Sequence, residues 1–256
     1  MAEFLAGSEE LFVMQMNKRA KELGMNNTTF KNAHGIDEDG HLTTAYDIAL
    51  MSAELLKNHP NIIKYTTIWM DTLRNGTSQL VNTNKLIRNY SGATGLKTGS
   101  TSLALYNLSA SATKNDLSLI AVILKSPSSD IRFNEAKKLL DYGFNTYSFK
   151  TFGNAGDIIE TIPINKAIMD NLDLIFETTA GCLVEKGQEK NIIQNINIEK
   201  NISAPIISGQ KLGEITFTLN DVLISKANIV AKNDVPKISG WNMLTHVVSN
   251  WFTLHR

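Results

Sequence analysis

The chain has 256 residues, of which 43% are hydrophobic and 20% are charged, a balance typical of a globular protein with one large or two modest domains. Its 25 basic and 25 acidic residues cancel, so the sequence lacks the basic excess that nucleic-acid binding requires. Cys182 is the single cysteine and the five histidines are scattered, which excludes an internal disulfide and predicts neither a metal site nor a cofactor.

The first part of the chain shows helical patterns. Apolar residues recur at helical spacing over residues 4–23 and again over residues 45–59, where Thr43 or Thr44 is a suitable N-cap. The intervening residues 25–42 are rich in Asn, Thr, Gly and Asp, which predicts a loop. The start shows no basic stretch followed by an apolar run, so no signal peptide is predicted, and no window is long and apolar enough to span a bilayer.

Strand patterns dominate the next segment. The triplet Arg74-Asn75-Gly76 predicts the turn of a hairpin. Residues 105–113 alternate apolar and polar, as in a half-buried strand, whereas residues 117–124 are apolar on both faces, as in a central strand. A helix capped by Ser128 or Ser129 follows, so this region is expected to form an α+β layer fold.

The pattern changes again after Gly153. Residues 158–235 hold short β-rich runs separated by Gly, Asn and Lys, which predicts a small all-β domain. Residues 238–254 place two tryptophans and a phenylalanine on one helical face and polar side chains on the other. We therefore expect three parts, formed by residues 1–150, 151–236 and 237–256.

One short motif, Lys97-Thr98-Gly99-Ser100, opens the first long strand. On an edge strand, a peptide ligand can pair with the backbone. There Lys97 offers a cation and Thr98 a hydroxyl to an anionic group of such a ligand, and Gly99 leaves room for close approach. A backbone N–H just beyond can help to bind a developing oxyanion. An isolated Lys-Thr-Gly is most often only a turn before a strand, so the surrounding residues decide.

Several neighbouring segments resemble one known family. They are Asn32-Ala33-His34-Gly35-Ile36-Asp37, Asn82-Thr83-Asn84-Lys85-Leu86, Gly92-Ala93-Thr94-Gly95-Leu96 before the motif, Pro127-Ser128-Ser129, Arg132-Phe133, and the helical run from Ala136 to Phe144. Together they resemble the serine D-alanyl-D-alanine carboxypeptidases, the low-molecular-mass penicillin-binding proteins of peptidase family S11. The resemblance covers about the first 150 residues; the β-rich part matches in architecture.

The resemblance implies the C-terminal part of a penicillin-binding, β-lactamase-like transpeptidase domain, followed by a small all-β domain and a C-terminal amphipathic helix. The family uses three motifs: Ser-x-x-Lys, Ser-x-Asn and Lys-Thr-Gly. Only the third is in place here. Ser-x-Asn is absent, and Ser208-Gly209-Gln210-Lys211 lies in the β-rich part, where a turn residue is expected instead. We therefore predict no catalytic residue in this chain and expect it to begin just downstream of the second motif.

Other residues carry weaker expectations. An Arg-Asn-Gly like that at Arg74 contributes to carboxylate recognition in relatives, although an exposed hairpin arginine fits equally well. His34 is expected to have a structural role, because the family uses lysine as its base. Asp37, Glu38 and Asp39 lack the other positions of a calcium loop, so a solvated turn is expected.

Intact relatives are expected to remove the terminal D-alanine of peptidoglycan stem peptides through an acyl-serine, and to bind β-lactams. The alternatives are a non-catalytic binding module that keeps the Lys-Thr-Gly strand and, fitting less well, a β-lactamase. Residues 237–256 are expected to lie on a membrane surface. They would hold the protein on the outer face of the cytoplasmic membrane, with the β-rich part as a stalk.

Overall fold

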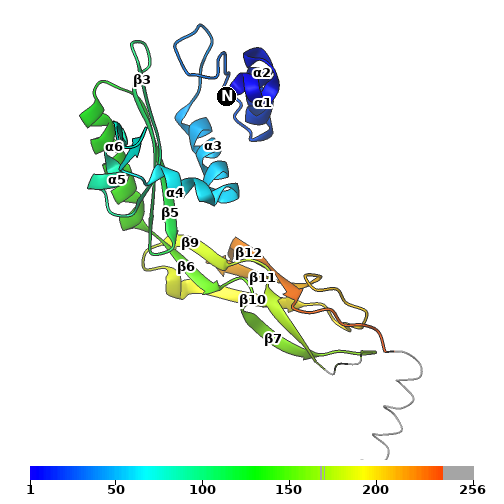
Figure 1. The fold of residues 1–256 in the computed structure, drawn as a ribbon. Helices are drawn as coiled ribbons and strands as arrows, with labels where there is room; N and C mark the ends of the chain where they lie inside the picture. Colours follow the sequence, from blue (N-terminus) through cyan, green and yellow to red (C-terminus); the bar gives the residue numbers. More distant parts are fainter. Residues whose placement is uncertain (168, 170, 239–256) are drawn as a thin grey trace, which may run out of the picture. The chain divides into compact units, whose positions relative to one another are not determined.

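A computed structural model of the chain describes residues 1–167, 169 and 171–238. They form two compact units: the first ends at Thr146 and the second begins at Tyr147 (Figure 1). No helix in this described part is long and apolar enough to cross a bilayer. The amphipathic helix predicted over residues 237–256 falls almost entirely on residues 239–256, which lie outside the described part.

The first unit combines helices with a three-stranded sheet and a separate hairpin. Its elements are α1 (Ala2–Ala6), α2 (Glu9–Glu22), α3 (Ala45–Asn58), the short 3-10 turn η1 (Pro60–Ile62), α4 (Ile63–Thr66), β1 (Met70–Leu73), β2 (Ser78–Val81), α5 (Leu86–Asn89), β3 (Ala93–Thr101), β4 (Leu105–Lys114), β5 (Leu117–Ser126) and α6 (Ser129–Thr146). The helix predicted over residues 45–59, the hairpin and the helix after Ser128 are confirmed.

The N-terminal helical stretch differs from the prediction, because it is broken into α1 and α2. Gly7 ends α1 in the left-handed conformation (φ 86°), and the Ser8 hydroxyl caps α2 by accepting a hydrogen bond from the Leu11 N–H (3.2 Å). The apolar side chains remain largely exposed, with Phe4 87% accessible, and Ala20 is the one buried residue of α2. These two helices thus contribute little to the core of the unit.

The sheet order also corrects the prediction. β4 lies between β3 and β5, and all contacts between neighbouring strands are antiparallel. Residues 108–112 of β4 are buried on both faces, so the strand predicted to be half-buried is the central one. Its polar members are small hydroxyls with partners: Ser109 bonds to Ser52 of α3 (2.8 Å) and Ser111 to Thr94 of β3 (2.8 Å). β5, predicted to be central, lies at the edge.

Helices cover both faces of this sheet. α3 and α6 lie on opposite sides of it (Figure 1), and both contact β4 and β5. The Ser128 hydroxyl caps α6 by accepting from the Ile131 N–H (3.2 Å). Gly143 allows α6 to approach β5 closely, because a Cβ there would lie 2.5 Å from a methyl group of Leu119. The sheet is thereby held firmly between two helices.

The second unit is almost entirely β. Its elements are β6 (Tyr147–Gly153), β7 (Ile158–Pro163), β8 (Asn171–Phe176), β9 (Ala180–Glu185), the short turn η2 (Glu189–Asn191), β10 (Ile192–Ile198), β11 (Lys211–Leu219) and β12 (Val222–Ala231). β6 pairs with β9, and the other strands form an antiparallel sheet in the order β10-β11-β12-β8-β7. The predicted small all-β region is confirmed.

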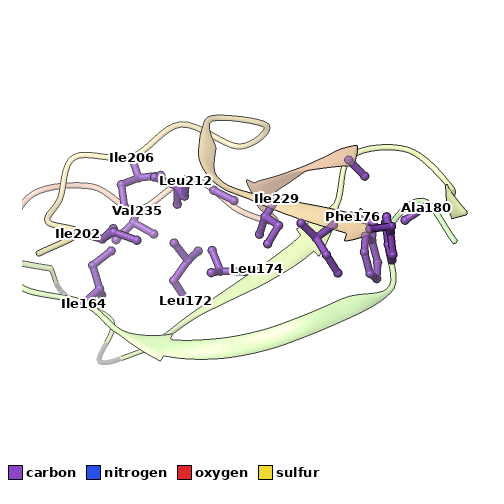
Figure 2. Packing of buried hydrophobic residues seen from close by; sticks show 14 of the residues in the cluster. Ile164, Leu172, Leu174, Phe176, Ala180, Ile202, Ile206, Leu212, Ile229 and Val235 are labelled. Atoms are coloured by element: carbon purple, nitrogen blue, oxygen red, sulfur yellow. The ribbon is translucent and has the colours of Figure 1, made fainter. Parts of the chain in front are cut away.

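One apolar cluster fills this β unit. Leu172, Leu174, Leu212 and Ile229 are among its fully buried members and face a common interior (Figure 2). Phe217, also fully buried, is stacked on another phenylalanine with ring centroids 4.7 Å apart. Each such side chain contributes about 1.5–3 kcal/mol on burial, so the unit has a core of its own.

Candidate active site

The Lys-Thr-Gly-Ser segment lies in β3, at the edge of the three-stranded sheet. On its inner side it pairs with β4 in a regular antiparallel register, in which Lys97 opposes Ser109 and Gly99 opposes Asn107. β4 is the only neighbour of β3 among the strands of the described part. An edge strand offers one row of backbone N–H and C=O groups to a ligand, so the geometry suits an extended peptide.

The motif presents a cation and open space. Lys97 is exposed, and its ammonium donates to the backbone carbonyl of Thr98. Gly99 is also exposed, and a Cβ there would meet no heavy atom within 4 Å. The space beside Gly99 is therefore free for a ligand, and a lysine cation lies two residues away on the same face of the strand.

Thr98 lies on the other face of the strand and is 8% accessible. Its hydroxyl is 2.6 Å from the hydroxyl of Thr83, which is exposed and lies between β2 and α5. Thr83 belongs to the run Asn82-Thr83-Asn84-Lys85-Leu86 that resembles the family, but no role was predicted for it. This contact joins two residues that are 15 positions apart, a distance over which local patterns are uninformative.

Side chains from preceding elements hold the start of β3. The Thr66 hydroxyl donates to the Thr94 carbonyl (2.6 Å), and the Asn84 amide donates to the Gly95 carbonyl (2.9 Å). Asn84 is almost fully buried, so its hydrogen bond to the Gly95 carbonyl is shielded from water and fixes the position of β3. The strand is thus positioned immediately before the motif begins.

Arg132 of α6 holds the same strand at the motif itself. Its guanidinium donates from Nη1 to the carbonyls of Gly99 (3.2 Å) and Asn107 (2.9 Å), which are paired across β3 and β4. The rings of Tyr106 and Phe133 lie 5.5 and 4.7 Å from the guanidinium carbon. Burial lowers the pKa of Arg132 from its ordinary value, and the charge interaction with Tyr106 acts in the opposite direction.

Asp37 anchors the turn after the motif. It accepts from the Thr101 hydroxyl (2.7 Å) and from the Leu103 N–H (3.3 Å). The solvated turn expected for this residue is therefore wrong, because both carboxylate oxygens bind the β3–β4 connection. In the part of the chain that the structure describes, no group of His, Cys, Asp and Glu side chains has the arrangement of a metal site.

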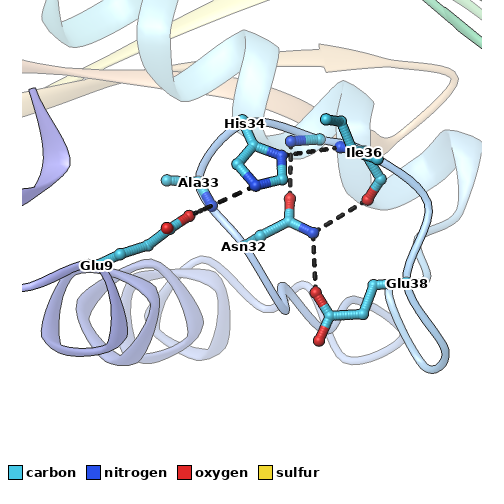
Figure 3. A network of polar contacts seen from close by, with 7 residues as sticks. Glu9, Asn32, Ala33, His34, Ile36 and Glu38 are labelled. Atoms are coloured by element: carbon cyan, nitrogen blue, oxygen red, sulfur yellow. Dashed lines mark hydrogen bonds and ion pairs between the residues drawn. The ribbon is translucent and has the colours of Figure 1, made fainter.

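His34 belongs to a network within the loop before α3 (Figure 3). Its Nδ1 accepts from the Ile36 N–H (3.2 Å), and its Nε2 lies 3.8 Å from Glu9. In the same loop, Asn32 donates to the Ile36 carbonyl and to Glu38, both at 3.0 Å. These contacts fit the structural role expected for His34.

Arg74 occupies the tip of the β1–β2 hairpin. It is exposed, has a positive φ of 52°, and its carbonyl accepts from the N–H (3.2 Å) and hydroxyl (2.7 Å) of Thr77. Among the described residues its guanidinium forms no ion pair and no hydrogen bond with the motif. The structure therefore does not bring Arg74 into contact with Lys97 or Thr98.

Ser208 lies in an exposed turn before β11. Its hydroxyl donates to the Lys232 carbonyl (2.9 Å), while Lys211 is paired with Glu214 (3.2 Å). The sequence holds a second Ser-x-x-Lys, Ser111-Ala112-Thr113-Lys114, which was not predicted as a candidate. Ser111 is buried in the central strand, and residues three apart on a strand point to opposite faces. Neither serine has a lysine placed to activate it.

A cavity of about 400 Å³ lies elsewhere in the first unit, between α5 and α6. Lys85, Asn89, Phe133 and Lys137 are among the residues that line it. No residue of the Lys-Thr-Gly-Ser segment does, so this cavity is distinct from the open edge of β3.

Comparison with known proteins places this geometry in context. Residues 1–128 match the family model described as D-alanyl-D-alanine carboxypeptidase, and residues 147–237 match that of the penicillin-binding protein 5 C-terminal domain. The chain is 38% identical to D-alanyl-D-alanine carboxypeptidase DacF of Bacillus subtilis, over 98% of this chain and 65% of the relative. It is 32% identical to DacC of Escherichia coli, over 98% and 64%. It thus spans slightly less than two thirds of these relatives.

Solved structures show the same similarity. Penicillin-binding protein 5 of Haemophilus influenzae superposes with a TM-score of 0.71 at 30% identity, covering 92% of this chain and 69% of that protein. Penicillin-binding protein D2 of Listeria monocytogenes, in a cefotaxime-bound form, gives a TM-score of 0.52 at 34% identity, covering 56% and 58%.

Proposed function

Because this chain belongs to the D-alanyl-D-alanine carboxypeptidase family, peptidase S11, we propose that it carries the substrate-binding strand of a serine D-alanyl-D-alanine carboxypeptidase. The substrate is a peptidoglycan stem peptide that ends in D-Ala-D-Ala. The observation that carries the proposal is the edge position of β3, where an exposed Lys97 stands beside the open space at Gly99.

The strand would bind the peptide as an additional strand and receive its terminal carboxylate. Lys97 supplies positive charge for that carboxylate, and Thr98 a hydroxyl. The backbone near Ser100 supplies N–H groups at the free edge, of the kind that stabilise an oxyanion. Arg132 and Asn84 act through the strand, because they fix the positions of Gly99 and Gly95 by hydrogen bonds to their carbonyls.

The reaction is acyl transfer followed by hydrolysis. A serine oxygen attacks the carbonyl carbon of the penultimate D-alanine, and the peptide C–N bond breaks. The terminal D-alanine leaves after its nitrogen takes up a proton, and water then cleaves the acyl-serine ester. In this proposal the serine and its base come from residues other than these 256, since among the described residues neither the Ser208 nor the Ser111 hydroxyl is hydrogen-bonded to a lysine ammonium.

β-Lactams carry a carboxylate next to a reactive amide, as the peptide does, so the same strand would bind them. The Listeria relative was solved with cefotaxime and with ampicillin bound. A non-catalytic binding module that keeps the Lys-Thr-Gly strand is the second candidate. Reading the DNA upstream of Met1 separates the two: an in-frame Ser-x-x-Lys and Ser-x-Asn would favour the enzyme.

Peptide binding tests the proposal on the chain itself. A synthetic stem peptide ending in D-Ala-D-Ala should shift the NMR amide signals of residues 97–101 in a saturable manner. The same peptide with its carboxylate converted to an amide should bind about tenfold more weakly or worse, because it loses the charged hydrogen bonds. Equal binding of acid and amide peptides, or no response from β3, would contradict the proposal.

The C-terminal segment belongs to this proposal as a membrane-surface helix formed by residues 237–256. Its two tryptophans, Trp241 and Trp251, and Phe252 suit the headgroup region, while Lys237 and Arg256 attract anionic lipid weakly. The alternative is a helix that packs on protein. If the segment is an anchor, the protein acts at the outer face of the cytoplasmic membrane.

Liposome flotation measures this directly. The full chain should float with vesicles that contain anionic lipid, whereas a chain ending at Pro236 should stay in the bottom fraction. Identical behaviour of the two chains would show that the segment is not an anchor.

A further inference from the structure

We propose that strand β10 is an interaction surface at which two copies of this chain pair edge to edge, as an antiparallel dimer formed through the β unit. The surface lies outside the Lys-Thr-Gly-Ser segment and takes no part in the proposed function. A second copy is the partner because the open edge of β10 is uncharged, unprotected and complementary to itself.

The first argument is the position of β10. It is the terminal strand of the five-stranded sheet, and β11 is its only neighbour among the strands of the described part. Its other side therefore presents a row of backbone N–H and C=O groups to a further strand. Ile193 and Ile196 are 54% and 51% accessible, so even the apolar side chains of β10 are half open to solvent.

The second argument is a contrast with β7, the opposite edge of the same sheet. β7 contains Glu160, ends in Pro163, and shifts its register against β8 between Ile158 and Glu160. Charge, proline and an irregular register are the features by which natural edge strands prevent pairing with other chains. β10 reads Ile-Ile-Gln-Asn-Ile-Asn-Ile over residues 192–198, without charge or proline, and pairs with β11 in an unbroken register. One edge of the sheet is thus protected, whereas the other is suited to pairing.

The third argument is self-complementarity. A twofold axis perpendicular to the sheet at Asn195 makes two β10 strands antiparallel and keeps the same face of each on the core side. All seven residues are then paired between the copies: Ile192 with Ile198, Ile193 with Asn197, Gln194 with Ile196, and Asn195 with its own equivalent. No charges meet at these positions, and the two Asn195 amides can donate to and accept from each other.

Pairing would also continue the apolar core of the β unit. Gln194 and Ile196 lie opposite Phe217 and Ile215 of β11, which are 0% and 1% accessible, so this side of β10 is the core face. Ile196 is nevertheless half exposed, because no strand of the described part lies beyond it. A second β10 would shield Ile196 from water and add a ladder of backbone hydrogen bonds.

Sedimentation equilibrium of the full chain tests the dimer. Seven paired residues form an interface at the small end of the range for specific complexes, so we expect a reversible dimer with a Kd of about 10–100 µM. Asn195→Lys should weaken it about tenfold or more, because two lysines would face each other across the axis. Asn233→Lys is the matched control: Asn233 is exposed after β12, so the same change in charge should leave the Kd unaltered.

Cysteine cross-linking tests the register independently of Asn195→Lys. With a short thiol-reactive cross-linker, Asn195→Cys should link to itself, whereas Ile193→Cys and Asn197→Cys should link to each other far better than to themselves. The unaltered chain controls for background, because its one cysteine, Cys182, is buried. A chain that stays monomeric up to about 500 µM, well above the expected Kd, would overturn the inference. So would a dimer that Asn195→Lys leaves intact, or one in which Asn195→Cys does not cross-link.

Discussion

The purified chain of 256 residues is expected to remain unlabelled after incubation with a fluorescent penicillin. Acylation needs a serine whose hydroxyl is within hydrogen-bond reach of a base. The Ser208 hydroxyl donates to the Lys232 carbonyl, and Lys211 is paired with Glu214. The Ser-x-x-Lys match at Ser208 therefore does not bring a lysine ammonium to the serine hydroxyl. Ser111 is 1% accessible and bonds to Thr94 within the sheet.

Mass spectrometry of the intact chain provides the measurement, with a complete D-alanyl-D-alanine carboxypeptidase as the positive control. The expected mass is that of the free chain, whereas the control should gain the mass of one penicillin. A heat-denatured sample controls for nonspecific labelling. Stoichiometric label on a serine would refute the expectation, and loss of that label in Ser208→Ala would show that the turn interpretation of Ser208 is wrong.

Much of the fold follows from local sequence signals. Thr44 caps α3 and Ser128 caps α6, both through hydroxyls that accept from the N–H three residues on. Asn75 and Gly76 take the left-handed conformation that the hairpin tip requires. The predicted α+β unit followed by a small β unit matches the family models in both halves of the chain.

The strand order was not predictable in the same way. An alternating pattern is typical of a strand with one solvated face, yet β4 is central because Ser109 and Ser111 find hydroxyl partners on α3 and β3. Those partners are 57 and 17 residues away in sequence. A buried serine with a partner and an exposed serine look identical to a local pattern, so only the tertiary contacts decide.

The same limit applies to the site. The Lys-Thr-Gly segment could be predicted from its residue types and its place at the start of a strand. The structure puts that strand, β3, at the edge of the three-stranded sheet. The contact between Thr83 and Thr98 gave no local signal, because the two residues are 15 positions apart in the sequence. Arg74 stays a prediction for carboxylate recognition, and the structure places it at the tip of the β1–β2 hairpin.

Lys97→Ala should weaken binding of the acid peptide by about 10- to 100-fold, the effect of removing a charged hydrogen-bond donor from a carboxylate. Lys97 is exposed on the edge strand, and its ammonium rests on the Thr98 carbonyl within the motif. Alanine removes the cation while the β3–β4 pairing remains, since that pairing uses backbone groups. The amide peptide, which lacks the negative charge, should respond far less.

The decisive measurement is therefore the affinity of the acid peptide, determined by NMR titration for the unaltered chain, Lys97→Ala and Lys57→Ala. Lys57 is an exposed lysine of α3, so its replacement makes the same change in net charge outside the motif. The account predicts a large loss for Lys97→Ala, near-normal binding for Lys57→Ala, and a smaller difference between them at high salt. Equal affinity in Lys97→Ala and the unaltered chain would contradict the assignment of β3 as the substrate-binding strand.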